Sequence, residues 1–258
     1  MHIAVCAKQI PDPADPPSFD AVTHRLVRTG SIILDDSDAY SVEMALRLAE
    51  VAGGEVTAVS IAPDGEMAGL RTALAMGVQR AVLVSDPALG GLDALGTAKI
   101  LAAVVRRIGA DLVLTATEST DGYTGTVPVQ LAELLSWPAL SFARHVELDG
   151  DELHVHRQTE AGYDELACPP PAVVTVTAGV VEVRYPTLKG IMSARSKPVD
   201  ELGLSDLGLD PAGLGTAGAR QEVVSIEDAA LRQAGTVVPD DGTGHLAVVA
   251  AMRTWKIL

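Results

Sequence analysis

The stretch VTAVSIAPDGEMAGLRTALAMGVQRAVLVS, residues 56–85, decides the fold class of this 258-residue chain. Residues 56–62 and 81–85 are short apolar runs of the kind found in buried strands. Between them, residues 67–76 have the apolar spacing of a helix, which ends at Gly77. A buried strand, a helix and a second buried strand predict two parallel strands joined by a crossover helix.

The same alternation continues in both directions along the chain. We expect further buried strands at residues 3–7, 112–116 and 172–176, and further helices at 38–52, 92–108 and 127–135. Residues 140–148 and 152–159 instead alternate apolar and polar side chains around Asp149-Gly150, which is a hairpin signal. The pattern predicts a doubly wound, mostly parallel α/β sheet with an antiparallel addition.

After Pro198 the regular alternation of strand and helix patterns ends. Short segments are interrupted by Gly203, Gly208, Gly213, Gly215 and Gly218, and a short helix is expected at 246–255. We therefore expect a body of residues 1–198 and a C-terminal arm, residues 199–258, that lies on another protein surface. The alternative is a frayed tail.

Charge and composition exclude several classes of function. The net charge of −15 argues against nucleic acid as a partner, because nucleic-acid binding needs a basic surface. No apolar run reaches the length of a membrane span, and the N-terminus has no secretion signal, so we expect a cytoplasmic protein without membrane insertion. The two cysteines, Cys6 and Cys168, are too few and too far apart for a disulfide framework or a metal site.

A candidate ligand site follows from the expected topology. In parallel sheets ligands bind beyond the carboxyl ends of the strands, where the strand order reverses. Three segments occupy such positions: the loop after the first strand, residues 35–38, and the loop ESTDGYTGTVPV at 118–129. In the last of these, glycines allow close backbone approach, and hydroxyl groups flank the start of the next helix, as in a phosphate site. The alternative is a helix cap and turn built from the same residues.

A second candidate is RYPTLKGIMSARSK, residues 184–197. It carries four basic residues and no acidic one, although the chain as a whole is acidic. It also carries Leu188, Ile191 and Met192 in a segment too polar and glycine-interrupted to be core. Apolar side chains inside a basic loop are what a docking peptide needs, with a buried anchor and steering charges. The alternative is a solvated basic loop.

Two further patterns resemble ligand-binding motifs but lack the structural context that such motifs need. Gly213, Gly215 and Gly218 spell the spacing of a dinucleotide-binding loop, but no strand precedes them, so we expect no such site there. His154 and His156 share one face of an expected strand without a third ligand nearby, so we expect no metal.

Both candidate segments resemble one family, the electron transfer flavoprotein β subunits. RYPTLKGIMSARSKP at 184–198 is similar to the loop with which that family grips its partner dehydrogenase, and ESTDGYTGTVPVQLAELL at 118–135 to its nucleotide-phosphate loop. Further matches are AVCAKQIPD at 4–12, SVEMALRLAE at 41–50, LRTALAMGVQRAVLVSD at 70–86 and PAVVTV at 171–176. The matches keep their order over residues 1 to about 198, and a weaker match continues into the arm.

The resemblance implies an electron carrier rather than an enzyme. The chain would pair with an α subunit that holds most of an FAD, and the heterodimer would carry electrons from dehydrogenases, such as acyl-CoA dehydrogenases, to electron transfer flavoprotein–quinone oxidoreductase and the quinone pool. The β subunit would hold a structural AMP, or a second FAD in electron-bifurcating members. No side chain here would be catalytic, because the flavin carries the redox step. The alternatives are a bifurcating subunit with its own FAD and a stand-alone, universal-stress-like nucleotide-binding protein.

The resemblance also implies site residues. The nucleotide would contact Cys6, Asp35, Asp36, Ser37, Asp38, Ile61, Glu118, Ser119, Thr120, Asp121, Gly122, Tyr123, Thr124, Gly125, Thr126, Val127, Pro128 and Val129. The dehydrogenase would contact Arg184, Leu188, Lys189, Ile191, Met192, Arg195 and Lys197, with Leu188 as the anchor. Many members have Asn-Pro-Phe where this chain has Asp35-Asp36-Ser37. The acidic residues there would repel a phosphate unless they are paired or turned away.

Overall fold

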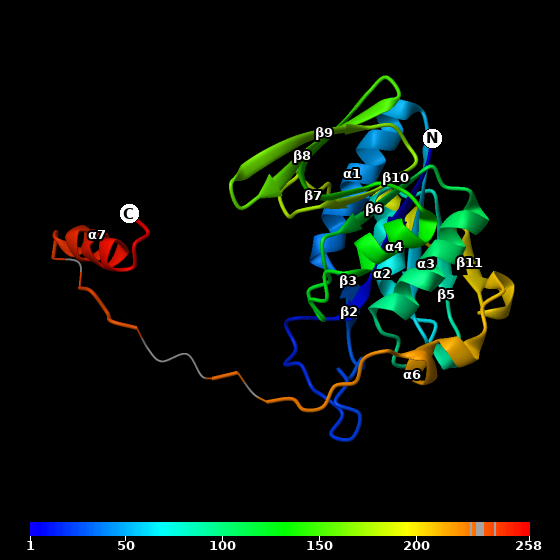
Figure 1. Ribbon diagram of the computed structural model, residues 1–258, viewed down its shortest axis with the longest axis horizontal. Helices are drawn as coiled ribbons and strands as arrows, with labels where there is room; N and C mark the ends of the chain where they lie inside the picture. Colours follow the sequence, from blue (N-terminus) through cyan, green and yellow to red (C-terminus); the bar gives the residue numbers. More distant parts are fainter. Residues whose placement is uncertain (228, 231–234, 240) are drawn as a thin grey trace. The chain divides into compact units, whose positions relative to one another are not determined.

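The computed structural model of the chain describes residues 1–227, 229–230, 235–239 and 241–258. Contacts divide the chain into two compact units, Met1–Val224 and Ser225–Leu258. The first unit holds a sheet whose nine strands lie in the order β11-β5-β4-β1-β6-β10-β7-β8-β9 (Figure 1). Their bounds are β1 His2–Cys6, β4 Glu55–Ile61, β5 Arg80–Val84, β6 Leu112–Ala116, β7 Ala139–Asp149, β8 Glu152–Thr159, β9 Gly162–Cys168, β10 Ala172–Val176 and β11 Val199–Leu202.

The strand pairing confirms the predicted fold class. Every pair from β11 to β7 is parallel, and β7, β8 and β9 pair antiparallel. A separate two-stranded sheet joins β2 (Gln9–Pro11) to β3 (Ile32–Leu34). The expected hairpin is therefore present, but β9 extends it by a third strand that the sequence pattern did not predict. Most β9 side chains are exposed, so it lacks the apolar alternation of a half-buried strand.

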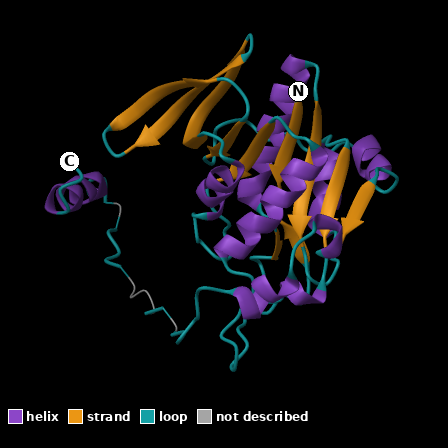
Figure 2. Cartoon of the chain, turned by 45° about the vertical axis from the view of Figure 1, so that its right-hand side comes forward, coloured by secondary structure: helices purple, strands orange, loops and turns teal. Residues whose placement is uncertain are grey.

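Helices cover both faces of the parallel strands (Figures 1 and 2). Ile3 and Val5 of β1 pack into one core cluster with the helices α1 and α2, whereas Ala4 packs into the other with α3 and α4. Strands that are buried on both faces read as continuous apolar runs, which is why the sequence identified them. The bounds of these helices are α1 Asp36–Ala52, α2 Ala68–Met76, α3 Ala94–Ile108 and α4 Val127–Leu135.

N-terminal capping residues explain why two helices begin at other residues than predicted. Helix α1 starts two residues before the expected position 38, because the Asp35 side chain accepts a hydrogen bond from the Ser37 N–H. Helix α3 starts two residues after the expected position 92, because Asp93 caps it through the Gly96 N–H.

The segment at 184–197, expected as a loop, contains the helix α5 (Leu188–Ala194). Its start is fixed by Thr187, whose side chain accepts a hydrogen bond from the Gly190 N–H. A seven-residue helix with an internal glycine has too few turns to show helical periodicity, so the sequence pattern did not indicate it.

The residues after 198 do not form one uniform arm. Strand β11 adds an edge to the sheet beside β5, and the side chains of Leu204 and Leu214 are buried in the core. The short helix α6 (Gly215–Gly218) follows, and the first compact unit continues to Val224.

The second unit contains the helix α7 (Gly244–Thr254), close to the helix expected at 246–255. Within the described residues of this unit, no residue of α7 is buried. Large apolar side chains in and after it are instead exposed, among them Leu246, Val248, Trp255, Ile257 and Leu258. No helix in the described ranges is both long enough and apolar enough to cross a membrane.

Candidate functional site

The strand order reverses between β1 and β6. The chain runs from β1 to β4 and β5 on one side, and then crosses so that β6 lies on the other side of β1. Because these strands are parallel, the loops after β1 and β6 leave the same edge of the sheet. The structure thus brings the segments near residues 8, 35–38 and 118–129 together at the switch point that the sequence predicted.

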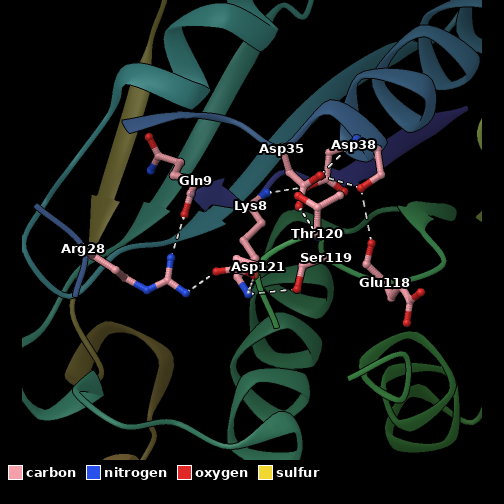
Figure 3. A network of polar contacts seen from close by, with 10 residues as sticks. Lys8, Gln9, Arg28, Asp35, Asp38, Glu118, Ser119, Thr120 and Asp121 are labelled. Atoms are coloured by element: carbon pink, nitrogen blue, oxygen red, sulfur yellow. Dashed lines mark hydrogen bonds and ion pairs between the residues drawn. The ribbon is translucent and has the colours of Figure 1, made fainter. Parts of the chain in front are cut away.

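An ion-pair network connects the two loops at this edge (Figure 3). Lys8, two residues after the end of β1, donates from Nζ to Oδ1 of Asp121 at 2.6 Å and to Oγ of Ser119 at 3.0 Å. Arg28 donates to the other carboxylate oxygen of Asp121 and, at 3.2 Å, to the carbonyl oxygen of Gln9. Burial opposes ionisation, but the charges and hydrogen bonds of Lys8 and Arg28 hold the pKa of Asp121 below its ordinary value.

Asp35 and Asp38 face the protein rather than solvent. Asp35 is fully buried, and its Oδ2 accepts a hydrogen bond from the Thr120 N–H at 2.7 Å. Asp38 is also buried, and its Oδ2 accepts from the Lys8 N–H at 2.6 Å. Each carboxylate therefore fixes the start of α1 to one of the two loops. Asp36, between them, is exposed.

Burial has a large effect on the ionisation of Asp38. Desolvation, supported by the nearby charge of Asp35, raises the pKa of Asp38 to about 7, against the lowering effect of the Lys8 N–H. Cys6, at the end of β1, is affected in the same way: burial, together with the charge of Asp38, raises the pKa of its thiol to about 12. Cys6 is therefore a neutral thiol, without the lowered pKa of a reactive cysteine.

The tip of the loop after β6 is exposed to solvent. Residues 122–126 are all exposed, and Gly125 adopts a left-handed conformation with φ of +65°. A Cβ added at Gly125 would lie 3.3 Å from Oε2 of Glu118. Helix α4 begins directly after this loop with Pro128 in its first turn, and within the described residues the side chain of Thr126 makes no capping hydrogen bond. Pro128 has no N–H, but the N–H groups of Val127 and Val129 have no partner within the helix, so this end of α4 suits an anion.

The other predicted nucleotide contacts lie at the same edge. Cys6 ends β1 and Ile61 ends β4, its parallel neighbour, and both are partly buried. Sequence reasoning missed two cations of the site. Lys8 could have been found, because it follows the first strand directly within the matched segment at 4–12. Arg28 lies in a long exposed stretch between β2 and β3, and no local pattern indicates that it reaches Asp121.

The predicted docking segment presents apolar side chains to solvent. Leu188 is 76% exposed, Met192 69% and Ile191 51%. Tyr185, just before the helix, is 93% exposed. Lys189 and Arg195 are also exposed, so cations accompany these apolar side chains.

Two other predicted docking residues are instead engaged inside the chain. Arg184 pairs with Glu43 at 2.6 Å and with Glu50 at 2.9 Å. Lys197 donates to the carbonyl oxygens of Leu74, at 2.7 Å, and Val78, at 2.6 Å, where α2 ends. A cation at the end of a helix offsets the partial negative charge of its last carbonyl groups. Both residues thus hold the segment 184–197 on the body.

Close packing also fixes α5 on α2. A Cβ added at Gly190 would lie 2.4 Å from the carbonyl oxygen of Ala75, so only glycine fits this contact. Arg71 of α2 donates to the Ala194 carbonyl oxygen at 2.8 Å. The exposed apolar side chains of α5 therefore stand on a rigid support.

The histidines on the antiparallel strands lie among acidic groups. The His145 and His156 rings are 5.0 Å apart between centroids, and His154 lies 3.7 Å from a Glu152 carboxylate oxygen. Among the described residues, no group of three or more His, Cys, Asp or Glu side chains is arranged to hold a metal ion.

Comparison with known proteins gives a consistent set of relatives. The family model described as "Electron transfer flavoprotein domain" matches residues 23–207. The electron transfer flavoprotein subunit beta of Thermoanaerobacterium thermosaccharolyticum is 36% identical over 239 residues, 92% of each chain. That of Mycobacterium bovis is 33% identical over 264 residues, 100% of this chain and 99% of the relative. The caffeyl-CoA reductase-Etf complex subunit CarD of Acetobacterium woodii is 35% identical over 218 residues, 83% of each chain.

Proposed function

The chain belongs to the electron transfer flavoprotein β-subunit family, and from this premise we propose that it pairs with an α subunit to form a cytoplasmic electron carrier. In this proposal most of the FAD lies in the α subunit, and this chain holds a structural AMP. The heterodimer takes electrons from dehydrogenases such as acyl-CoA dehydrogenases and passes them to electron transfer flavoprotein–quinone oxidoreductase. When bound, the flavin supplies the redox chemistry, and the residues of this chain bind, orient and dock.

The observation that carries the nucleotide proposal is the exposed loop 122–126 at the switch point. Glycine backbone, hydroxyl groups and the start of α4 stand together there, and these groups bind phosphate well. The acidic residues before and within α1 do not prevent this, because Asp35 and Asp38 are buried and bonded to backbone N–H groups. The residues present therefore fit an adenine nucleotide whose phosphate lies between the loop 122–126 and the first turn of α4.

The docking proposal rests on α5. An exposed cluster of Leu188, Ile191 and Met192 on an otherwise acidic chain is suited to a pocket on a dehydrogenase. Lys189 and Arg195 would steer the encounter, because charges at the rim of an interface act mainly on the association rate. For the C-terminal arm, we propose that α7 and the residues after it pack on the α subunit, which would cover their exposed apolar side chains.

The test is to co-express the chain with the α subunit encoded with it and to identify what the purified heterodimer holds. We expect one FAD and one AMP per heterodimer by mass spectrometry of the extracted nucleotides. A heterodimer that carries FAD but no adenine nucleotide on this chain would overturn the AMP assignment and leave the electron-carrier role in place.

A second candidate is an electron-bifurcating β subunit that holds its own FAD instead of AMP. It is favoured by the relative whose name places it in a caffeyl-CoA reductase complex. The same extraction separates the two, since two FAD molecules without AMP would support the second candidate. The third alternative, a stand-alone nucleotide-binding protein, requires a chain that is stable as a monomer, and the exposed apolar surface of α7 argues against it.

A further inference from the structure

Two cations from distant parts of the chain converge on one carboxylate beside the loop 122–126 (Figure 3). Lys8 and Arg28 each bind a different oxygen of Asp121. Asp121 is nearly inaccessible, with a side chain 5% exposed, whereas those of Lys8 and Arg28 are 41% and 40% exposed. The carboxylate is thus nearly inaccessible, whereas both cationic side chains remain partly exposed to solvent.

The ammonium group of Lys8 lies beside the loop 122–126. A Cβ added at Gly122 would lie only 3.8 Å from Nζ of Lys8. An ammonium group has three N–H donors, and Lys8 uses two of them on Ser119 and Asp121. A guanidinium group has five, and Arg28 donates to Asp121 and to the Gln9 carbonyl oxygen. Both cations therefore retain the capacity to bind a second anion.

The other charges around the loop are negative. Glu118 is exposed and lies beside Gly125, and Asp36 is exposed at the start of α1. A phosphate at this loop would meet these carboxylates as well as the backbone N–H groups. Without a compensating positive charge, the repulsion would oppose binding.

Building on the proposed nucleotide site, we propose that Lys8 and Arg28 neutralise the phosphate of the bound nucleotide, and that Asp121 is the counter-ion that positions them for it. Asp121 orients both cations and also competes with the phosphate for their charge. The ion pair is therefore expected to affect phosphate-bearing ligands and to leave the nucleoside part unaffected.

The test compares binding of AMP and of adenosine to the heterodimer after removal of its nucleotide, by calorimetric titration. We expect Lys8→Met and Arg28→Met each to weaken AMP binding at least about tenfold and to change adenosine binding less than about twofold. Lys8→Arg, which keeps the charge, should retain most of the AMP affinity. Arg25→Met is the matched control, because Arg25 lies in the same stretch as Arg28 but donates to Thr216.

The direction in which Asp121→Asn changes the AMP affinity separates the two explanations. As a competing counter-ion, Asp121 lowers phosphate affinity, so its neutralisation should strengthen AMP binding several-fold. If the triad only held the loop in shape, Asp121→Asn and Lys8→Met would both weaken AMP and adenosine alike, and the inference would be wrong. If Lys8→Met and Arg28→Met bound AMP with the same affinity as the wild type, the inference would also be wrong, but the proposed nucleotide site would stand. Failure of the wild-type heterodimer to bind AMP or FAD on this chain would overturn both.

Discussion

Glu43 and Arg184 form an ion pair across 141 residues of sequence, with Nε of Arg184 2.6 Å from Oε2 of Glu43. The Glu43 side chain is only 2% exposed, and Arg47 binds its other oxygen at 2.8 Å. Burial opposes the charge of Glu43, but the hydrogen bonds from Arg184 and Arg47 hold the pKa of Glu43 below its ordinary value. The pair fastens the segment that leads into α5 to the middle of α1.

Removal of the Glu43 charge should therefore destabilise the chain. We expect Glu43→Gln to lower the free energy of unfolding by about 2 kcal/mol, the usual order for hydrogen bonds to charged groups. Glu50→Gln is the control: Glu50 also pairs with Arg184, but its side chain is 61% exposed, so its loss should cost less than about 1 kcal/mol. Because the folded pKa of Glu43 is lowered, its contribution is present above the ordinary pKa and is lost as the pH falls through the folded value. Urea unfolding at neutral and acidic pH measures both effects, and equal costs for the two variants would contradict this account.

Lys197 and Lys189 should behave differently despite their shared place in the basic segment. Lys197→Met removes two hydrogen bonds to the carbonyl groups that end α2, so we expect a loss of about 1–2 kcal/mol of stability. Lys189→Met should leave stability unchanged, since Lys189 is exposed, and should reduce the salt dependence of electron transfer from a dehydrogenase. Thermal unfolding and stopped-flow kinetics at several ionic strengths separate the two. Normal stability of Lys197→Met would show that its contacts at the end of α2 contribute little.

Leu188 should contribute to docking and not to folding. Because Leu188 is 76% exposed, Leu188→Ala should leave stability and nucleotide content intact. It should weaken dehydrogenase binding by about 1–3 kcal/mol, the range for truncating an interface anchor. Val51→Ala, on α1, is a matched control because Val51 is 72% exposed and lies outside α5. The measurement is electron transfer from a reduced dehydrogenase at sub-saturating concentration. Wild-type rates for Leu188→Ala would mean that α5 is not a docking element.

The ionisation of Asp38 should make stability depend on pH. Its folded pKa, about 7, is raised above the ordinary value of 3.8, so its contribution is fully present below the ordinary pKa and declines as the pH rises through 7. Asp38→Asn keeps an oxygen for the Lys8 N–H and removes the charge. The difference in stability between Asp38→Asn and the wild type should therefore grow in favour of the variant from pH 5 to pH 8. Parallel urea midpoints of the two proteins over this range would show that Asp38 stays in one protonation state.

Truncation tests the role of the second unit. Deletion of residues 225–258 leaves the whole first unit, including the buried Leu204 and Leu214, so the shortened chain should still fold. We expect it to lose co-purification with the α subunit, because the exposed apolar residues of α7 are then missing. Circular dichroism checks the fold, and affinity purification checks assembly. Normal yield of a heterodimer with the truncated chain would contradict the proposed packing of α7.

Burial determined which elements could be predicted from sequence. Strands β6 and β10, which are buried throughout, and helix α4, with its Pro128 and apolar face, were predicted at their observed bounds. Strand β9 and strand β11 were not, because at the two edges of the sheet they have few buried side chains and no apolar alternation.

The candidate site was predictable at the level of loops. The topology rule places the ends of β1 and β6 together, and the glycines and hydroxyl groups at 122–126 mark the loop as a candidate anion site. It was not predictable that Asp35 and Asp38 turn inward, because that depends on the Thr120 and Lys8 N–H groups from other loops. The ion pair between Arg28 and Asp121 was not predictable either, because the two residues are 93 apart in sequence and no local pattern marks either of them.

The sheet edge formed by β11 has a consequence for synthesis of the protein. Strand β5 ends at Val84, but its outer partner β11 begins at Val199, so more than a hundred residues must be made before that edge is closed. Until β11 is made, β5 has no outer partner in the sheet, and unpaired strand edges invite pairing with other chains. Pairing of β11 with β5 closes that edge, so we expect the late part of the body to lower the tendency of the chain to aggregate.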